Sequence, residues 1–184
     1  MTADKEFRMN TPILETDRLI LRPFCPEDAQ EVFDCWESDP EVAKYMFWSS
    51  HNDIQKTKEW LSFEIDRISS ERWFRWAVVL KADNVLIGTG LVYFDEEYGL
   101  FEVGYNFGRS YWGQGYASEA MREIIRYVKD VLKVKELVGR YAKENIASGK
   151  VMEKLGFRYC RDISYEANEG KHRYEGIECR LILE

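Results

Sequence analysis

The spacing of apolar residues predicts one short strand and two helices in the first third of the chain. The strand runs from Arg18 to Arg22 and ends at Pro23. The first helix opens at Cys25-Pro26, where a proline suits the first turn, and ends at Pro40. The second runs from about residue 53 to 69. Their buried stripes are Val32, Phe33 and Trp36 in the first and Ile54, Trp60, Leu61, Ile65 and Ile68 in the second.

From Trp73 onwards the period changes, and β-branched and aromatic residues predict strands. Trp76 to Lys81, Val85 to Phe94 and Leu100 to Phe107 form an antiparallel meander with short turns. The later elements are a helix with apolar positions from Met121 to Leu132, a strand at Leu137 to Tyr141, a helix at about Ile146 to Leu155, a strand from Phe157 and a strand at Tyr174 to Leu183. This order predicts a single α/β (α+β) domain whose mixed, mostly antiparallel sheet is flanked by helices.

Length and composition indicate one ordinary globular domain. The chain has 184 residues, 45% hydrophobic and 32% charged, with 12 glycines and 4 prolines. These values exclude a collagen-like, low-complexity or disordered chain. The longest apolar run, Trp76 to Leu80, is far too short for a membrane span. Residues 1–10 have no apolar core, so we expect a flexible N-terminal segment that is not a secretory signal, followed by a domain at residues 11–184.

The net charge, the cysteines and the histidines limit which ligands and which cellular location we expect. The 26 basic and 33 acidic residues leave a net charge of −7, the opposite of what phosphate contacts with nucleic acid require. The four cysteines form neither a CxxC pair nor a zinc spacing, which favours reduced thiols in a cytoplasmic protein. His51 and His172 stand alone, so we expect no metal site. We therefore expect a cytoplasmic monomer or homodimer with no direct contact to nucleic acid or membrane.

The segment from Gly108 to Ala120 is the most informative part of the chain. It joins a predicted strand to a predicted helix, and Gly113 and Gly115 let a ligand approach the backbone closely. Free N–H groups at the helix start would face that ligand, and the helix dipole favours an anion. These features indicate a cradle for pyrophosphate. The two glycines alone fit a tight strand-to-helix turn equally well.

Two common phosphate-binding motifs do not fit this loop. A P-loop requires Lys followed by Ser or Thr after its last glycine, and Tyr116 and Ala117 stand there instead. A dinucleotide-binding fold has a third glycine where this chain has Ser118, and an acidic residue at the end of the next strand, whereas Glu136 precedes that strand. Such a fold would also place its cradle first in the chain, and here a meander comes before it.

The loop resembles motif A of the GCN5-related N-acetyltransferases (the GNAT family), whose fingerprint is Gln/Arg-x-x-Gly-x-Gly/Ala. Gly115 and Ala117 match, and Trp112 stands at the first position in place of Gln or Arg. Two further segments resemble the RimJ/RimL-type branch, named for ribosomal-protein N-terminal acetyltransferases. These segments are Glu15 to Phe24 with Glu27-Asp28 behind it, and Asn145 to Ser148 followed by Glu153 to Phe157. The motifs keep the family's order and span about residues 14–183.

The resemblance implies a GNAT-like transferase that binds acetyl-CoA as a cosubstrate, without a metal, and moves its acetyl group to an amine. In this family the strand before the loop offers main-chain groups to pantetheine, and the loop amides hold the pyrophosphate. The corresponding cofactor-binding residues are Tyr105, Asn106 and Phe107 on the strand and Trp112, Gly113, Gln114, Gly115, Tyr116, Ala117 and Ser118 in the loop. Asn145 corresponds to a further cofactor contact and is equally a good N-cap for the helix at Ile146.

The charge distribution is compatible with an anionic cofactor. The segment from Arg109 to Lys154 contains ten basic and six acidic residues, a net charge of +4, which leaves −11 for the rest of the chain. A local positive field attracts an anion. A solvated, salt-bridged helix face gives the same charge count, and for any single Lys or Arg it is the better interpretation.

Acetyl transfer requires the amine to lose a proton and the carbonyl oxygen to be stabilised. Glu102 is the candidate base, acting directly or through a water, because some relatives carry a functional carboxylate there; a solvent-facing strand glutamate is the alternative. Ser148 is placed to bond the departing thiolate, although serine is common in a first helical turn. Many relatives have a tyrosine as general acid where this chain has Met152, which leaves Ser148 or no dedicated acid.

The acceptor pocket is expected among the aromatic residues of the first half, since Phe, Trp and Tyr number 10, 6 and 11 in the whole chain. Four residues there fit helix or strand periodicity least well: Tyr45, Phe47, Trp48 and His51. We expect acetylation of a peptide N-terminus or a small amine. Polyamine or aminoglycoside acetylation is an alternative because cationic acceptors suit the acidic remainder. A catalytically silent CoA-binding module is another, on account of Trp112 and Met152.

Overall fold

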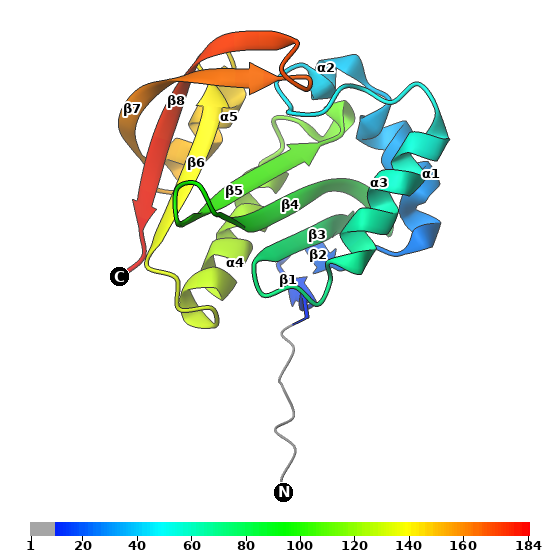
Figure 1. Cartoon of the computed structure of the whole chain (residues 1–184). Helices are drawn as coiled ribbons and strands as arrows, with labels where there is room; N and C mark the ends of the chain where they lie inside the picture. The colour runs from blue at the N-terminus through cyan, green and yellow to red at the C-terminus, as the bar shows by residue number, and fades with distance from the viewer. Residues whose placement is uncertain (1–9) are drawn as a thin grey trace, which may run out of the picture.

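An eight-stranded sheet crosses the centre of the molecule in the order β1-β2-β3-β4-β5-β6-β8-β7 (Figure 1). The computed structural model describes residues 10–184, so residues 1–9 of the predicted flexible segment lie outside the described part. The strands are β1 (Leu14–Glu15), β2 (Leu19–Arg22), β3 (Trp73–Leu80), β4 (Val85–Asp95), β5 (Leu100–Phe107), β6 (Glu136–Ala142), β7 (Arg158–Ala167) and β8 (His172–Ile182). Neighbouring strands are antiparallel except for β5 and β6, which confirms the predicted mixed sheet.

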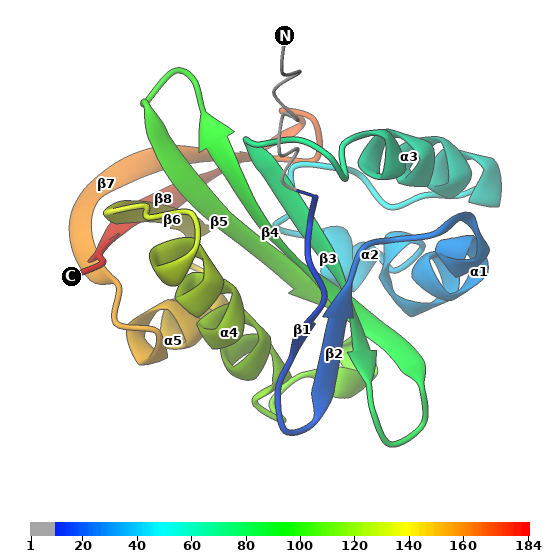
Figure 2. The same ribbon diagram turned by 90° about the horizontal axis from the view of Figure 1, so that it is seen from below.

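Helices flank both faces of the sheet, as the sequence predicts. They are α1 (Ala29–Val32), α2 (Pro40–Ala43), α3 (Ile54–Asp66), α4 (Tyr116–Asp130) and α5 (Ile146–Lys154). Figure 2 shows α4 and α5 on one side of the sheet and α1 and α3 on the other. β3 illustrates why both faces need cover. Phe74, Trp76 and Val78 pack in the core beneath α4, whereas Ala77 and Val79 pack in the core beneath α1 and α3, because successive side chains on a strand point to opposite faces.

The segment predicted as one helix from Cys25 to Pro40 consists of several short pieces. A 3-10 turn, η1 (Pro26–Asp28), leads into α1, and a π-helical turn, η2 (Phe33–Glu37), follows it. The break comes before Pro40, which begins α2 and does not end a helix. The Asp39 carboxylate caps α2 by accepting a hydrogen bond from Glu41 N at 2.9 Å. Proline fits this first turn because its missing N–H would have no partner within the helix.

β5 and β6 separate after three paired residues, from Phe101↔Leu137 to Val103↔Gly139. On its other side β5 remains paired with β4 as far as Phe107↔Gly88. The edge of β5 at residues 104–107 that faces β6 is therefore open, and its main-chain groups require other partners. The two strands therefore separate along the second half of β5.

The tip of the β7–β8 hairpin is tied to the segment that follows α2, and Figure 1 shows the two side by side. Asn168 Nδ2 donates hydrogen bonds to the carbonyl oxygens of Ala43 and Trp48 at 2.9 and 3.0 Å. Asn168 N donates to Met46 O at 2.8 Å. Asn168 adopts a left-handed φ of +52°, which asparagine tolerates better than most residues. Residues 43–48 are thus fixed by a turn about 120 positions later in the chain.

Candidate active site

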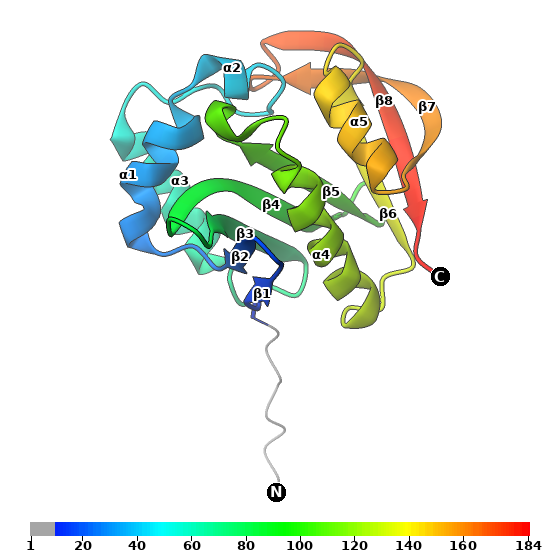
Figure 3. The ribbon, with the colours of Figure 1, turned by 180° about the vertical axis from the view of Figure 1, so that it is seen from behind.

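A groove of about 390 Å³ lies where β5 and β6 separate. Its walls are the end of β5, the loop leading into α4, the first turns of α4 and α5, and the segment from α2 to Met46. Figure 3 shows α4 and α5 next to each other on this side of the sheet. The predicted site residues that line the groove are Tyr45, Tyr105, Asn106, Phe107, Trp112, Gly113, Gly115, Tyr116, Ala117, Ser118, Asn145 and Ser148.

Five predicted site residues lie outside this lining, namely Gln114, Glu102, Phe47, Trp48 and His51. The groove instead includes residues that sequence reasoning missed, among them Glu41, Lys44, Met46, Lys150 and Lys154. The two lysines on α5 are spaced one turn apart, which places them on one helix face. This spacing is visible in the sequence and could have indicated that they belong to the site. The segment around α2 carries no local motif, because contacts with distant parts of the chain, such as the β7–β8 hairpin, hold it against the groove.

A second hollow, of about 440 Å³, lies beside η3 (Arg109–Tyr111) and is more open than the groove. Its wall includes three acidic side chains, those of Glu31, Asp34 and Asp39. Arg109 is the one basic residue in this lining, so the wall is net negative and repels phosphate groups, whereas the groove lining has three lysines against one acidic residue, Glu41. The groove is therefore the better site for an anionic ligand.

The loop between β5 and α4 has the backbone of an anion cradle. Gly113 and Gly115 have φ of +73° and +83°, a region that L-residues with side chains rarely adopt. A Cβ on Gly113 would meet no atom within 4 Å, so the space before the loop is free. Gly115 is the N-cap of α4 and has no side chain to accept the first-turn N–H groups, which remain available as donors. These features fit a pyrophosphate group.

The segment around Arg18 supports the loop from behind. Glu119, in the first turn of α4, accepts hydrogen bonds from Thr16 Oγ1 at 2.5 Å and from Arg18 Nε at 2.7 Å. The same guanidinium donates to the carbonyl oxygen of Gln114 and lies 4.3 Å from the centre of the Tyr116 ring. These contacts give the Thr16-Asp17-Arg18 motif near the N-terminus a physical role: it fixes the loop about 100 residues later.

Replacing Gly113 by alanine is expected to weaken CoA binding by at least about tenfold, since a strained loop aims its N–H donors away from a charged ligand. The backbone strain itself should cost about 1–2 kcal/mol of stability. Gly99→Ala is the matched control, because Gly99 also has a positive φ (+67°) and open space around it but lies in the β4–β5 turn. Titration calorimetry that finds equal affinities in the two variants would contradict the cradle.

The open edge of β5 has one main-chain group already satisfied. Trp112 Nε1 donates a hydrogen bond to Phe107 O at 2.7 Å, so the indole, although half-exposed, fixes the loop to the strand. The side chain of Asn106 is buried in the groove wall, and its Nδ2 has no hydrogen-bond partner. Trp112 therefore has a structural task at the position where the family fingerprint has Gln or Arg.

The first turn of α5 meets β5 across the groove. Asn145 caps the helix by accepting a hydrogen bond from Ser148 N at 3.1 Å, as its N-cap interpretation predicts. The hydroxyl of Tyr105 lies 2.9 Å from Ser148 Oγ. Met152, one turn further along, is buried, and a Cβ on Gly139 would approach its sulfur to 2.9 Å. Met152 thus packs in the core and offers the groove no proton.

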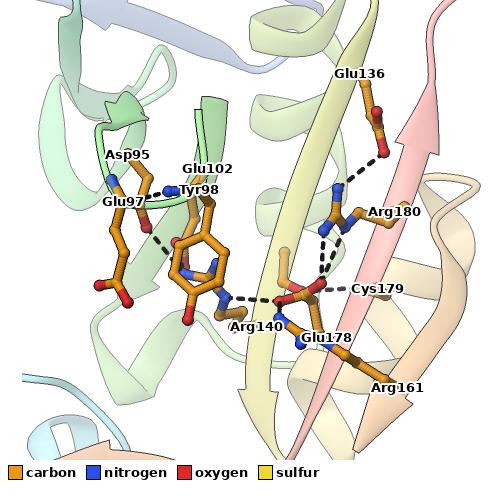
Figure 4. A network of polar contacts seen from close by, with 11 residues as sticks. Asp95, Glu97, Tyr98, Glu102, Glu136, Arg140, Arg161, Glu178, Cys179 and Arg180 are labelled. Atoms are coloured by element: carbon orange, nitrogen blue, oxygen red, sulfur yellow. Dashed lines mark hydrogen bonds and ion pairs between the residues drawn. The ribbon is translucent and has the colours of Figure 1, made fainter. Parts of the chain in front are cut away.

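Glu102 belongs to a network of charged side chains on the sheet face opposite α4 and α5 (Figure 4). Its carboxylate accepts a hydrogen bond from Arg140 Nη1 at 2.6 Å, and the same nitrogen lies 3.1 Å from Asp95 Oδ2. Arg140 stacks against the ring of Tyr98, 4.0 Å from its centre. Burial raises the pKa of Glu102, and the charge of Arg140 opposes this shift. Glu102 is therefore a shielded, ion-paired carboxylate and not a solvent-facing one.

His51 lies between α3 and the π-helical turn. Its Nδ1 is 2.8 Å from Thr57 Oγ1, and its Nε2 is 3.5 Å from a carboxylate oxygen of Glu37. Glu37 also accepts a hydrogen bond from Trp36 Nε1 at 2.9 Å. Burial raises the pKa of Glu37 to about 7, and burial lowers the pKa of His51. His51 thus connects α3 with η2.

We expect Glu37→Gln to change how stability depends on pH. The pKa of Glu37 is higher in the folded state than its ordinary 4.5, so the native chain loses stability as the pH rises from about 4.5 to about 7. Glutamine keeps the acceptor for Trp36 and has no such loss. Its stability relative to the unmodified chain should therefore rise across this window by up to roughly 3 kcal/mol. Denaturant unfolding at pH 5 and pH 8 measures this; a difference that stays constant with pH would contradict it.

Among residues 10–184, no helix combines the length and the hydropathy needed to cross a membrane. In the same part of the chain, no group of three His, Cys, Asp or Glu side chains is placed to hold a metal ion.

Comparison with known sequences connects this geometry with a family. A family model described as the acetyltransferase (GNAT) domain matches residues 18–158. The uncharacterized N-acetyltransferase p20 of Bacillus licheniformis is 34% identical over 171 residues, which cover 92% of this chain and 90% of that protein.

Comparison with solved structures identifies the same fold. A putative ribosomal-protein-serine acetyltransferase from Vibrio cholerae is similar with a TM-score of 0.81 at 20% identity, covering 95% of this chain and 99% of that one. The microcin C7 self-immunity acetyltransferase MccE, solved in complex with acetyl-CoA and AMP, has a TM-score of 0.80 at 16% identity and covers 91% of this chain and 93% of its own.

Proposed function

Because this chain belongs to the GNAT acetyltransferase family and is therefore an N-acetyltransferase that uses acetyl-CoA, we propose that its acceptor is a primary amine at a peptide N-terminus or on a small molecule. The observation that carries this proposal is the groove itself. It begins at the glycine loop, follows the open edge of β5 and ends at the segment around Tyr45, where an acceptor can meet the acetyl group.

The residues that hold acetyl-CoA in this proposal come from three elements. Donors at the start of α4 bind the pyrophosphate, the open edge of β5 pairs with pantetheine, and Lys150 and Lys154 lie close enough to the groove to attract phosphate. When bound, acetyl-CoA supplies an acetyl group activated as a thioester. The protein then has to orient the amine, take up its proton and bond the sulfur.

Glu102 takes the amine's proton in this proposal. It lies outside the groove lining, so in this proposal the proton passes through a bridging water. Its ion pair with Arg140 favours the ionised form that a base requires, while burial raises its basicity. Ser148, which lines the groove, bonds the sulfur.

Different observations support the two candidate classes of acceptor. A peptide N-terminus is favoured by the similar fold of the putative ribosomal-protein-serine acetyltransferase. A cationic polyamine or aminoglycoside is favoured by charge, because the chain outside residues 109–154 carries −11. These candidates differ in their response to salt, since screening weakens attraction between exposed charges.

The test is a panel of small amines, polyamines, aminoglycosides and peptides, with release of the CoA thiol as readout. We expect turnover with peptides that have a free N-terminus and none with the same peptides blocked by an N-acetyl group. Turnover confined to polyamines or aminoglycosides that falls with added salt supports the cationic alternative. Binding of acetyl-CoA with no turnover on any amine would contradict the proposal and favour a catalytically silent module.

A further inference from the structure

Tyr105 on β5 and Ser148 on α5 meet where the groove separates their two elements. The hydroxyl of Tyr105 lies 2.9 Å from Ser148 Oγ and 3.2 Å from Ser148 O. Both residues line the groove. We propose that Tyr105 is a positioning residue that orients the hydroxyl of Ser148 toward the sulfur of the thioester in the groove.

The reason lies in how a serine hydroxyl uses its single hydrogen. In a helix, a serine commonly donates that hydrogen to a carbonyl oxygen of the preceding turn, which takes it away from any ligand. A hydroxyl also has two lone pairs that accept hydrogen bonds. The Tyr105 hydroxyl has a single hydrogen. In the proposed arrangement it donates that hydrogen to Ser148 Oγ, the nearer acceptor at 2.9 Å against 3.2 Å for Ser148 O, which leaves the Ser148 hydrogen free to point into the groove. The backbone N–H of Ser148 is already bound by Asn145 and holds the residue in place.

Tyr105 acts here as a donor that keeps its proton. Burial raises its pKa well above the ordinary value of 10, so the hydroxyl stays neutral at working pH. A group that holds its proton so firmly is a poor general acid. Met152, which stands where many relatives have a tyrosine, is buried against Gly139 and has no hydrogen to give. The Tyr105–Ser148 pair is thus a hydrogen-bonding arrangement and not a source of protons.

This inference rests on the proposed function, because it requires a thioester sulfur in the groove. Transfer forms a bond from the amine nitrogen to the acetyl carbon and breaks the carbon–sulfur bond, whose electron pair remains on sulfur. The amine's proton goes to the base. Ser148 donates a hydrogen bond to the thiolate and keeps its proton, and the thiolate takes up a proton from solvent on release.

The pKa of the thiol of bound CoA tests the pair without any acceptor. It is measured by titrating the protein–CoA complex and following the ultraviolet absorbance of the thiolate. Tyr105→Phe keeps the ring and removes only the hydroxyl, and we expect it to raise this pKa by about one unit, as loss of a hydrogen bond to a charged group should. Ser148→Ala should raise it at least as far. The double variant should match Ser148→Ala, because Tyr105 acts through Ser148.

Tyr141→Phe is the matched control. The Tyr141 ring also packs against α5, at Gly149, but it lies outside the groove lining. We expect the thiol pKa in this variant to equal that of the unmodified chain. If Tyr105→Phe leaves the thiol pKa unchanged, or if Ser148→Ala does so, the inference is overturned while the proposed function stands. An unmodified chain that does not bind CoA would overturn both.

Discussion

Replacing Glu102 by glutamine is expected to lower kcat for amine acetylation by roughly 10²- to 10⁴-fold, the usual contribution of a general base. Glutamine has nearly the same shape and still accepts a hydrogen bond from Arg140, so the fold should be retained. It cannot take up a proton. The measurement is steady-state kinetics with the best amine of the panel, and KM for acetyl-CoA should remain unchanged because Glu102 lies outside the groove lining.

The pH profile gives this prediction a second readout. Burial raises the pKa of Glu102 above its ordinary 4.5, so kcat/KM should fall as the pH drops through a value above 4.5, and Glu102→Gln should lose this limb. Asp95→Asn is the matched control, because Asp95 lies 3.1 Å from the same Arg140 nitrogen but on β4. It should change kcat by no more than a few-fold. An unchanged kcat in Glu102→Gln would remove Glu102 as the base.

Replacing Glu178 by glutamine is expected to destabilise the protein by about 3–5 kcal/mol, the typical cost of removing one partner of a buried ion pair. Figure 4 shows three arginines converging on this carboxylate. Arg140 and Arg161 donate to Oε2 at 3.3 and 3.0 Å, and Arg180 donates to Oε1 at 2.8 Å. The Glu178 side chain is fully buried. The variant leaves these three arginines facing an uncharged side chain. Urea unfolding measures the resulting loss of stability directly.

Glu136→Gln is the control for this prediction. Glu136 pairs with Arg180 as well, at 3.0 Å, but its side chain is 35% exposed. Water and salt screen such a pair, so its loss should cost no more than about 1 kcal/mol. Equal stability losses in Glu136→Gln and Glu178→Gln would show that the arginines do not depend on Glu178.

The stability contributed by Glu178 should also depend on pH. Its arginine partners lower its pKa from 4.5 to about 2. A carboxylate with a depressed pKa in the folded state stabilises fully above the unfolded value and loses that effect as the pH falls. We therefore expect the difference between the unmodified chain and Glu178→Gln to shrink between about pH 4.5 and pH 2. A difference that stays constant in this range would contradict the prediction.

Local patterns predicted most of the fold because they depend on neighbours in the chain. β-branched and aromatic residues placed β4 and β5, and helical spacing placed α3, α4 and α5, with ends within a few residues. Pro40 was less informative, since a proline that ends one helix is equally suited to begin the next. The π-helical turn at η2 left no readable signal, because burial of Trp36 and Glu37 depends on α3 and β3 packed around them.

The charged network around Arg140 was beyond sequence reasoning for a similar reason. Its acidic partners Asp95, Glu102 and Glu178 are 38 to 45 residues away, on three different strands. No local sequence pattern indicates that charges so far apart will pair. The register of the sheet brings them together. The alternative of a solvent-facing Glu102 was wrong because Arg140 and Tyr98 cover that face of the sheet.

The sequence by itself determined the family, the order of the elements and the glycine loop, since each depends on residue types at short spacing. The absence of a Cβ permits the positive φ that Gly113 and Gly115 adopt in this loop. Only the tertiary structure decided what faces that loop. The early separation of β5 from β6 opened the groove, and the Asn168 turn held the segment after α2 against it. These contacts join parts of the chain more than 30 residues apart, so their energy comes from packing and register and leaves no local trace.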